Sequence, residues 1–366
     1  MNSQSSTPDS PLTGHQTDTR PRLVMPTWLI STAFSVGPVI IALLITGSLL
    51  MLMGVNPLTY YGYIVHKGLL TSSGIQATLT HMGPLLLIAA SLIVAFRAGI
   101  WNLGGDGQFL LGAVLAAACA PIMITWLPMW LTLPVCMVLG ALIGGVWALL
   151  PGFLKAYHQI NEIITTMMMS FLGISLANVL VKLVFLDPGT TVPQTRTLDI
   201  SHRLPAVFGS QISSGLFIGL AAIVAVHLLM TRTSFGLQLR VVGANTRAAV
   251  HAGLPVTWLT LAVFALSSAL AGLAGAVDVL SIQGNVRADW NPAYSLTIVP
   301  LVFLARFNGY ATVLFVMAFS ILSIGGESAA RMLGVPNFFT LVTVAILLMV
   351  LALSELIERR RTAKRS

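Results

Sequence analysis

Charged residues and cysteine are scarce in this sequence. Only 8% of the 366 residues are charged and 56% are hydrophobic, and the mean hydropathy is +0.89. A soluble globular domain needs many more charges to keep its surface solvated, so this composition excludes that class of protein. The two cysteines, Cys119 and Cys136, both lie inside apolar runs. We expect them to be small core residues there, and not a disulfide or a metal site.

Motifs that several classes of enzyme require are also missing. The dipeptide Gly-Lys does not occur, so the chain has no P-loop and is not expected to hydrolyse ATP by that route. Neither His-Glu-x-x-His nor Gly-x-Ser-x-Gly is present, and the 11 acidic residues are scattered. We therefore expect a protein that is not an enzyme and that holds no cofactor of its own.

Long apolar runs are what the sequence does contain. Since a membrane-spanning helix needs roughly 20 apolar residues, the chain has room for about ten spans with short connections. The runs cover residues 28–53, 79–96, 109–126, 130–153, 165–185, 214–231, 257–281, 295–305, 311–325 and 337–354. The run 295–305 is too short to cross alone, so we expect it to start within 291–295 or to form a broken helix. The prediction is an all-α fold, a polytopic transmembrane helical bundle of about ten spans.

The positions of the basic residues predict the orientation of the bundle. The net charge of +8 would suggest a nucleic-acid partner for a soluble protein. Here Lys and Arg lie mostly beside the ends of apolar runs, so no nucleic acid is expected. With the N-terminus inside, the cytoplasmic segments are 1–27, 97–108, 154–164, 232–256, 306–310 and 355–366, which hold most of the 19 Lys and Arg residues. We predict an N-in and C-in topology, with a disordered cytoplasmic tail over 1–27, a transmembrane domain over 28–354 and a basic cytoplasmic tail over 355–366.

A polar, glycine-rich segment, residues 97–108, interrupts two of the apolar runs. In one interpretation it is a tight cytoplasmic turn, in which Arg97 anchors one helix end and Asp106 caps the next helix. In the other it is a re-entrant break within the bilayer. Its backbone must then be buried in protein or line a wet cavity, as at the substrate sites of transporters. The candidate substrate-pathway residues in this segment are Arg97, Asn102, Gly104, Gly105, Asp106 and Gln108.

A second polar cluster, residues 159–166, precedes another apolar run. Asn161 can cap the helix that follows, and Glu162 lies in its first turn, where the helix dipole favours a negative charge. This structural interpretation explains both residues. A functional interpretation adds Asn161, Glu162 and Thr165 to the substrate pathway, with Thr165 and Thr166 on a cavity wall and Glu162 near a cytoplasmic partner.

A basic loop, residues 232–256, stands between two long apolar runs and must therefore lie in water. Residues Thr246–His251 are expected to form a short helix parallel to the membrane, and Asn245 is well placed to cap it. A small amphipathic helix on a loop suits a groove on a partner, whereas a merely solvated loop is the alternative. The candidate docking residues are Arg240, Gly243, Asn245, Ala249 and Gly253.

Three segments of the chain, in the same order, resemble one family of transport proteins. The loop pattern Arg-x-x-Gly-x-Asn-x-x-Ala-Ala-x-x-Ala-Gly-Leu, residues 240–254, resembles the loop that permeases of ATP-binding-cassette (ABC) importers press into their ATPase subunits. The patterns Phe-Arg-Ala-Gly-x-x-Asn-x-Gly-x-Asp-Gly-Gln, residues 96–108, and Asn-Glu-Ile-x-x-Thr-x-Met, residues 161–168, are similar to those of the permeases for nucleosides and simple sugars. These belong to the branched-chain amino acid/ribose permease superfamily. The chain departs from the pattern in carrying Asp106 where those permeases usually have Glu.

The resemblance implies the membrane-spanning permease subunit of an ABC importer for nucleosides or related simple sugars, in the inner (plasma) membrane of a bacterium. It also implies partners besides the lipid bilayer: a second permease subunit, an extracytoplasmic solute-binding protein, and ABC ATPase subunits that bind the ATP and dock on the loop 232–256. In this view the candidate docking residues couple the ATPase to transport. The alternative function is an ATP-independent channel or an ion-coupled carrier for a small polar solute.

Few ionisable residues lie inside the apolar runs. Asp278 and Glu327 either face substrate or lie at the membrane interface. Lys182 is close enough to an outer edge to snorkel, and His81 at the start of a run is expected to be a packing or capping residue.

Two further features concern packing and the outer surface. The small residues of 140–145 and 268–275 recur at three- and four-residue spacing, which predicts close helix packing and suggests a dimer interface. The loop Asp187–Ser213 is expected to fold over the outer mouth, where a delivery protein would land.

Overall fold

The computed structural model describes residues 27–207, 209–336 and 338–363, and these are helical almost throughout, with two isolated β-bridges. The predicted tail 1–27 falls almost wholly outside the described residues. In chain order the elements are α1 (Thr27–Leu52), α2 (Pro57–Val65), the π-helix η1 (His66–Leu70), α3 (Ser72–Arg97), α4 (Gly105–Met123), α5 (Met129–Trp147), α6 (Leu149–His158), α7 (Glu162–Val179), the π-helix η2 (Leu180–Val184), the 3-10 helix η3 (Ile200–His202), α8 (Gly215–Arg232), α9 (Ser234–Ala244), α10 (Thr246–His251), α11 (Val256–Asp278), the π-helix η4 (Val279–Gln283), α12 (Tyr294–Leu304), α13 (Gly309–Leu333) and α14 (Phe339–Ala363).

Seven helices in the described residues are long and apolar enough to cross a membrane. They are Ser72–Arg97, Gly105–Met123, Met129–His158, Glu162–Val184, Gly215–Arg232, Val256–Gln283 and Gly309–Leu333. Three shorter apolar helices, Val39–Leu52, Tyr294–Leu304 and Phe339–Ser354, match the remaining predicted runs. The all-α class is therefore confirmed, while the count of about ten spans stays a prediction.

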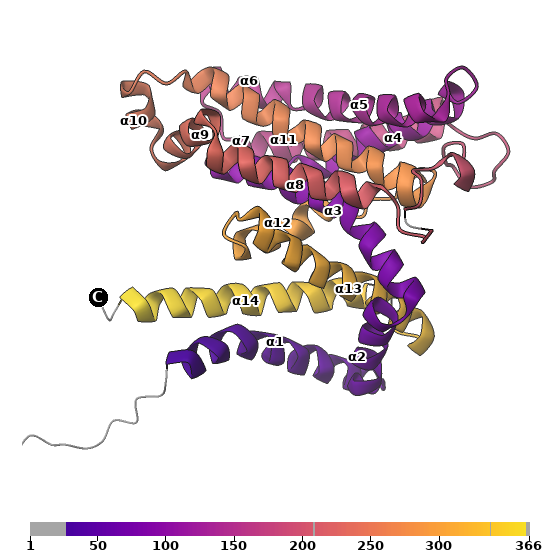
Figure 1. Ribbon diagram of the computed structural model, residues 1–366, viewed down its shortest axis with the longest axis vertical. Coiled ribbons are helices and arrows are strands. Elements are labelled where there is room, and N and C mark those ends of the chain that lie inside the picture. Colours follow the sequence, from indigo (N-terminus) through magenta and orange to yellow (C-terminus); the bar gives the residue numbers. More distant parts are fainter. Residues whose placement is uncertain (1–26, 208, 337, 364–366) are drawn as a thin grey trace, which may run out of the picture.

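The bundle places both ends of the described chain on one side. In Figure 1 the start of α1, the end of α14 and the pair α9–α10 all lie at the left of the view, whereas α2 lies at the right. This arrangement is what the N-in and C-in topology requires if α9–α10 face the cytoplasm. Which side of a membrane they face remains a prediction.

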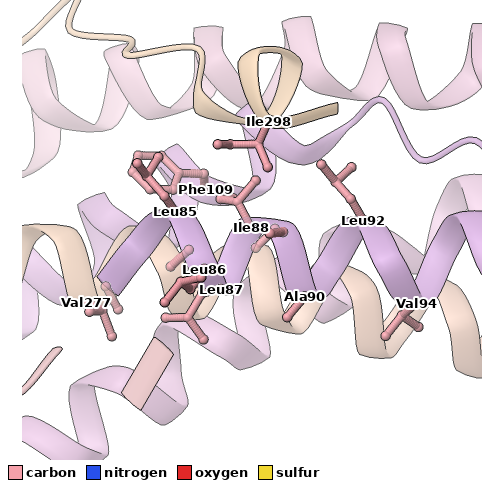
Figure 2. Close-up of a cluster of buried hydrophobic side chains, with 14 of the residues drawn as sticks. Leu85, Leu86, Leu87, Ile88, Ala90, Leu92, Val94, Phe109, Val277 and Ile298 are labelled. Carbon is pink, nitrogen blue, oxygen red and sulfur yellow. The ribbon is translucent and has the colours of Figure 1, made fainter. Parts of the chain in front are cut away.

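Helix α3 forms the centre of the core. Its residues from Met82 to Phe96 are all buried, and Figure 2 shows side chains on several of its faces meeting Phe109 of α4, Val277 of α11 and Ile298 of α12. A helix that is apolar all round is buried on all sides. The helix starts at Ser72, earlier than the predicted residue 79, because Thr71 caps it through a 3.2 Å hydrogen bond from the Gly74 N–H.

Helix α2 and the π-helix η1 were not predicted as a separate element. Tyr60 and Ile64 of α2 are buried against Val335 and Phe339, near the start of α14. This packing joins segments that are far apart in the chain, so no local apolar run predicts it.

The small residues of α4, α5 and α11 pack against one another within this chain. A Cβ added at Gly272 would collide with the Gly140 carbonyl oxygen, and one added at Gly144 would collide with that of Ser268. Close helix packing is therefore confirmed. The suggested dimer interface at these residues is wrong, because the two runs bury each other inside one subunit.

Replacing Gly272 with Ala is expected to destabilise the protein by about 1–3 kcal/mol, because overpacking forces helices apart. The measurement is the thermal unfolding midpoint in detergent. Gly62→Ala is the matched control, since a Cβ there has no atom within 4 Å. Equal midpoints for the two variants would contradict this account of the α4–α5–α11 contact.

Candidate functional site

The glycine-rich segment between α3 and α4 enters the bundle. Asn102 donates from Nδ2 to the hydroxyls of Ser267 and Ser268, at 3.2 and 3.1 Å. Ser267 lies roughly 16 Å along α11 from its start at Val256, at 1.5 Å per residue. Asn102 is 2% exposed. The structure therefore favours the re-entrant break over the cytoplasmic turn.

Side chains satisfy the backbone of this break, as a position away from water requires. The Leu103 N–H donates to the Thr166 hydroxyl at 3.2 Å, and the Gly104 N–H to Asn102 Oδ1 at 3.1 Å. Gln108 and Asn102 exchange two hydrogen bonds of 3.3 Å. The predicted residues Asn102 and Gln108 thus hold the break in place, together with Thr166.

Asp106 joins the start of α4 to the start of α12. Its Oδ1 accepts a 2.8 Å hydrogen bond from the Ser295 N–H, and a Cβ added at Gly105 would collide with the Ser295 hydroxyl. A carboxylate is favourable at a helix N-terminus, where N–H groups are unpaired and the dipole is positive. The expectation that Asp106 caps its own helix is wrong, because Gly104 occupies that N-cap position and Asp106 serves α12 instead.

A second break, residues 284–293, precedes α12 and was not identified from the sequence. Gly284, Asp289 and Ala293 all have positive φ, of 73°, 61° and 50°, so the chain turns sharply before Tyr294. The predicted early start or break of the run 295–305 is confirmed: α12 is an 11-residue helix. Two interrupted helices thus meet N-terminus to N-terminus, the arrangement that transporters use around substrate.

A polar cavity of about 580 Å³ lies beside this meeting point. Its lining comes from α3, the end of η4, the second break, α12, α13, and α14 with the residue before it: His81, Gln283, Arg287, Trp290, Asn291, Pro292, Tyr294, Thr297, Phe319, Ser323, Glu327, Arg331, Phe338, Thr340 and Leu341. Aromatic walls with a few polar groups in a volume of this size are typical of small-molecule sites. Trp290 and Tyr294 were missed; the turn residues Asn291 and Pro292 before a short apolar run were the available signal.

A second cavity of about 620 Å³ shares two lining residues with the polar cavity. Lys67, Thr71, Gly74 and other residues of η1, α3 and α13 line it. Glu327 and Arg331 line both cavities and approach each other to 3.6 Å. The two cavities therefore lie on either side of the Glu327–Arg331 pair.

The basic loop contains two helices. Helix α10 spans Thr246–His251, and Asn245 caps it by accepting a 3.0 Å hydrogen bond from the Ala248 N–H. The predicted short helix and its cap are confirmed, while its orientation parallel to the membrane stays a prediction. The preceding residues form a further helix, α9, that was expected to be loop. Thr233 starts it by accepting from the Gly236 N–H at 3.2 Å.

Gly243 brings this loop onto the first break. A Cβ added there would lie 2.7 Å from the Arg97 carbonyl oxygen and 2.9 Å from the Gly99 nitrogen, so only glycine allows the contact. Arg97 also donates from Nη2 to the Phe307 carbonyl at 3.0 Å. Phe307 lies in the turn between α12 and α13. Arg97 therefore contacts the basic loop at Gly243 and the end of α12 at Phe307, and so connects the two.

The other docking residues have distinct positions in the loop. Ala249 is the fully buried residue of α10, Arg240 is exposed, and Gly253 turns the chain toward α11 with a φ of 75°. Large apolar side chains remain exposed on α9 and α10: Leu237, Val241 and Val250.

The cluster before α7 has a structural role in this conformation. Asn161 caps α7 by accepting from the Ile163 N–H at 2.9 Å. Glu162 pairs with Lys155 of α6 at 2.8 Å. Thr165 bonds to the Asn161 and Glu162 carbonyls of its own helix. The neighbouring Thr166 hydroxyl hydrogen-bonds to the first break, at the Leu103 N–H and the Trp101 carbonyl.

The position of one ionisable residue inside the apolar runs differs from expectation. His81 lies inside α3, and not at the start of a span, and lines the polar cavity. Lys182 pairs with the exposed Asp289 of the second break at 3.0 Å, and its snorkelling to a membrane edge stays a prediction. Asp278 is fully buried at the end of α11, and Glu327 lines both cavities.

The loop Asp187–Ser213 is attached to the second break. The Thr195 N–H donates to the Val286 carbonyl at 3.0 Å and the Leu198 N–H to the Gly284 carbonyl at 2.8 Å. Arg203 donates from Nη1 to the Ile282 carbonyl at 2.9 Å. The loop is therefore bonded to the second break, which itself lines the polar cavity.

Comparison with known proteins gives matches over most of the chain. Residues 74–351 match the family described as branched-chain amino acid transport system / permease component. A glucose ABC transporter permease protein of Haloferax volcanii is 30% identical, over 93% of this chain and 92% of the relative. A guanosine ABC transporter permease protein of Bacillus subtilis is 30% identical, over 56% of this chain and 59% of the relative. A nucleoside ABC transporter permease protein of Lactococcus lactis is 28% identical, over 63% and 66%. No solved structure matches the chain.

Proposed function

Because the chain belongs to the family of branched-chain amino acid transport system permease components, we propose that it carries nucleosides or related simple sugars through the inner membrane of a bacterium. Its relatives are sugar and nucleoside permease proteins of ABC transporters. The chain is accordingly a multi-pass permease subunit of that transporter class, and not an enzyme. The identity of the solute and the location in a bacterial inner membrane are proposed.

One observation carries the proposal: the contact of Gly243 with Arg97 and Gly99. It joins the loop expected to meet an ATPase with the break expected to lie on the substrate pathway. From Arg97 the contacts continue through Phe307 and α12 to Asp106 and the polar cavity. A displacement of α9–α10 would therefore move the helix that walls the cavity, which is how access could alternate between the two sides.

The proposed partner at α9–α10 is an ABC ATPase subunit, which binds the ATP. Exposed Leu237, Val241 and Val250 on two short helices suit a hydrophobic groove, and the exposed Arg240 beside them suits a polar rim. A second permease subunit and an extracytoplasmic solute-binding protein complete the proposed complex. The binding protein would deliver solute at the outer loop Asp187–Ser213.

Uptake measurements test the proposal directly. Cells that carry the partner ATPase and binding protein are assayed with labelled uridine, guanosine and ribose, with and without this chain. We expect nucleoside uptake that requires this chain and disappears when the ATPase carries a substitution that abolishes ATP hydrolysis. Uptake of ribose alone would keep the importer and change the solute. Uptake that survives loss of the ATPase would support the channel or ion-coupled carrier instead.

A further inference from the structure

Helix α7, with its extension η2, holds both breaks of the bundle. At the first break, the Leu103 N–H donates to the Thr166 hydroxyl and the Gly107 N–H donates to the Ser170 hydroxyl, each at 3.2 Å. Thr166 and Ser170 lie one turn apart on α7. The first break and the start of α4 are therefore fixed to the first half of α7.

The second break is fixed to the other end of the same helix. Asn178 Oδ1 accepts a 2.8 Å hydrogen bond from the Asp289 N–H. Lys182 of η2 donates to both carboxylate oxygens of Asp289, at 3.2 and 3.0 Å. Asp289 is thus held at its backbone by Asn178 and at its side chain by Lys182.

The backbone conformation of Asp289 explains why these contacts are needed. Its φ of 61° lies in the left-handed region, which is unfavourable for a residue with a Cβ and persists only where the surroundings determine it. The ion pair with Lys182 is exposed, since 73% of the Asp289 side chain is accessible, so it adds little to the stability of the whole fold. Its effect is therefore local, on the conformation of the second break.

The residue that follows Asp289 is Trp290, which lines the polar cavity. Trp290 is partly buried, and its ring centroid lies 6.0 Å from that of Phe109 in α4. If Asp289 relaxed to a conformation with negative φ, the chain after it would change direction. The indole would then leave its place in the cavity wall.

We propose that Asn178 and Lys182 are positioning residues for the polar cavity: through Asp289 they fix the second break so that Trp290 stays in the cavity wall. We call Asn178, Lys182 and Asp289 the α7 clamp. None of the three lines the cavity, so the clamp acts through Trp290 and not by touching solute. Because α7 also holds the first break, one helix sets the position of both breaks. The inference rests on the proposed function in one respect, that this cavity lies on the solute pathway.

Cysteine labelling tests the clamp without reference to any solute. Ala288, beside Asp289, is partly buried, so a thiol placed there reacts slowly unless the second break opens. The permease and its partner ATPase are reconstituted in lipid nanodiscs, with Ala288→Cys in a background of Cys119→Ala and Cys136→Ala. The rate of labelling of the permease by N-ethylmaleimide is then measured by mass spectrometry, for this protein and after adding Asn178→Leu or Lys182→Met.

We expect the labelling rate to rise roughly fivefold with Lys182→Met and roughly tenfold with Asn178→Leu, the changes in open population that loss of an exposed ion pair and of one hydrogen bond allow. The double variant should lower uptake of labelled guanosine by cells roughly twofold or more, because only molecules with the break in place can hold solute. Exchanging the charges, with Lys182→Asp and Asp289→Lys together, should bring the labelling rate back toward wild type.

The matched control is Thr197→Val. Thr197 is exposed and accepts a 2.9 Å hydrogen bond from Asn285 Nδ2. The substitution therefore removes one bond between the loop Asp187–Ser213 and the second break while leaving Asp289 held. We expect wild-type labelling for this control. The thermal unfolding midpoint should be the same for the clamp variants and the control, since the clamp acts locally.

Three results would overturn the inference. One is unchanged labelling in both Asn178→Leu and Lys182→Met. Another is an equal rise in Thr197→Val, which would show a general loosening of the second break. The third is faster labelling with normal uptake in the double variant, which would show that the clamp does not position the pathway. A wild-type protein that takes up none of guanosine, uridine or ribose would instead contradict the proposed function, while the labelling rates would still decide whether the clamp holds the break.

Discussion

Replacing Gly243 with Glu is expected to lower solute uptake by roughly a hundredfold or more while leaving the permease in the membrane. The Cβ alone would lie 2.7 Å from the Arg97 carbonyl and 2.9 Å from the Gly99 nitrogen. These are backbone atoms that cannot turn aside, so α9 must separate from the break. An ATPase-driven displacement would then no longer reach Arg97. For comparison, a misplacement of about 1 Å caused by a remote mutation can cost an enzyme roughly 10²-fold in rate. Uptake and the amount of membrane-inserted protein are the two measurements.

Two further variants serve as controls for Gly243→Glu. Gly243→Ala introduces the same Cβ collision without a charge, and we expect an intermediate loss of uptake. Gly62→Ala adds the same methyl group where no atom lies within 4 Å, and should transport normally. ATP hydrolysis by the complex should persist in Gly243→Glu but lose its dependence on delivered solute. Normal uptake by Gly243→Glu would remove the main support for the coupling role of α9–α10.

Replacing Asp106 with Leu is expected to abolish uptake and to destabilise the bundle by roughly 2–4 kcal/mol, the range for losing a buried, charge-assisted hydrogen bond. Asp106 is 5% exposed and accepts from the Ser295 N–H at 2.8 Å. Its loss leaves the first turn of α12 without a cap. Because Tyr294 of the polar cavity lies in that turn, the cavity wall should lose its position. The measurements are uptake and the thermal unfolding midpoint in detergent.

Two substitutions at the same position refine this expectation. Asp106→Asn keeps an acceptor oxygen and the size of the side chain, so it should retain most of the stability and lose only the charge at the α12 N-terminus. Asp106→Glu carries the acid usual in the similar permeases but needs one more methylene beside Gly105, which already approaches Ser295 closely. We expect it to fold with reduced uptake. Wild-type behaviour of Asp106→Leu would show that this bond holds neither the fold nor the pathway.

Much of the candidate site could be located from the sequence, but its contacts could not. The segment 97–108 was identified because four glycines and several polar residues interrupt apolar runs, a pattern that is visible locally. The hydrogen bond from Ser295 to Asp106 joins residues 189 positions apart, and no local pattern indicates such a pairing. The same holds for Thr166 against Leu103 and for Gly243 against Arg97. The second break was missed because its turns depend on positive φ at Asp289 and Ala293, residue types that do not by themselves require it.

The sequence by itself determined the class of this protein, its helical content and the short helix α10 with its Asn245 cap. These features depend on apolar run length and on hydrogen bonds between near neighbours, which the residue order specifies directly. Only the tertiary structure decided that the first break is buried inside the bundle, that Asp106 serves α12 and that His81 and Tyr294 line one cavity. Those outcomes depend on contacts between segments that are far apart in the chain. Away from water every buried polar group needs a hydrogen-bond partner, and this requirement determines which distant contacts are stable.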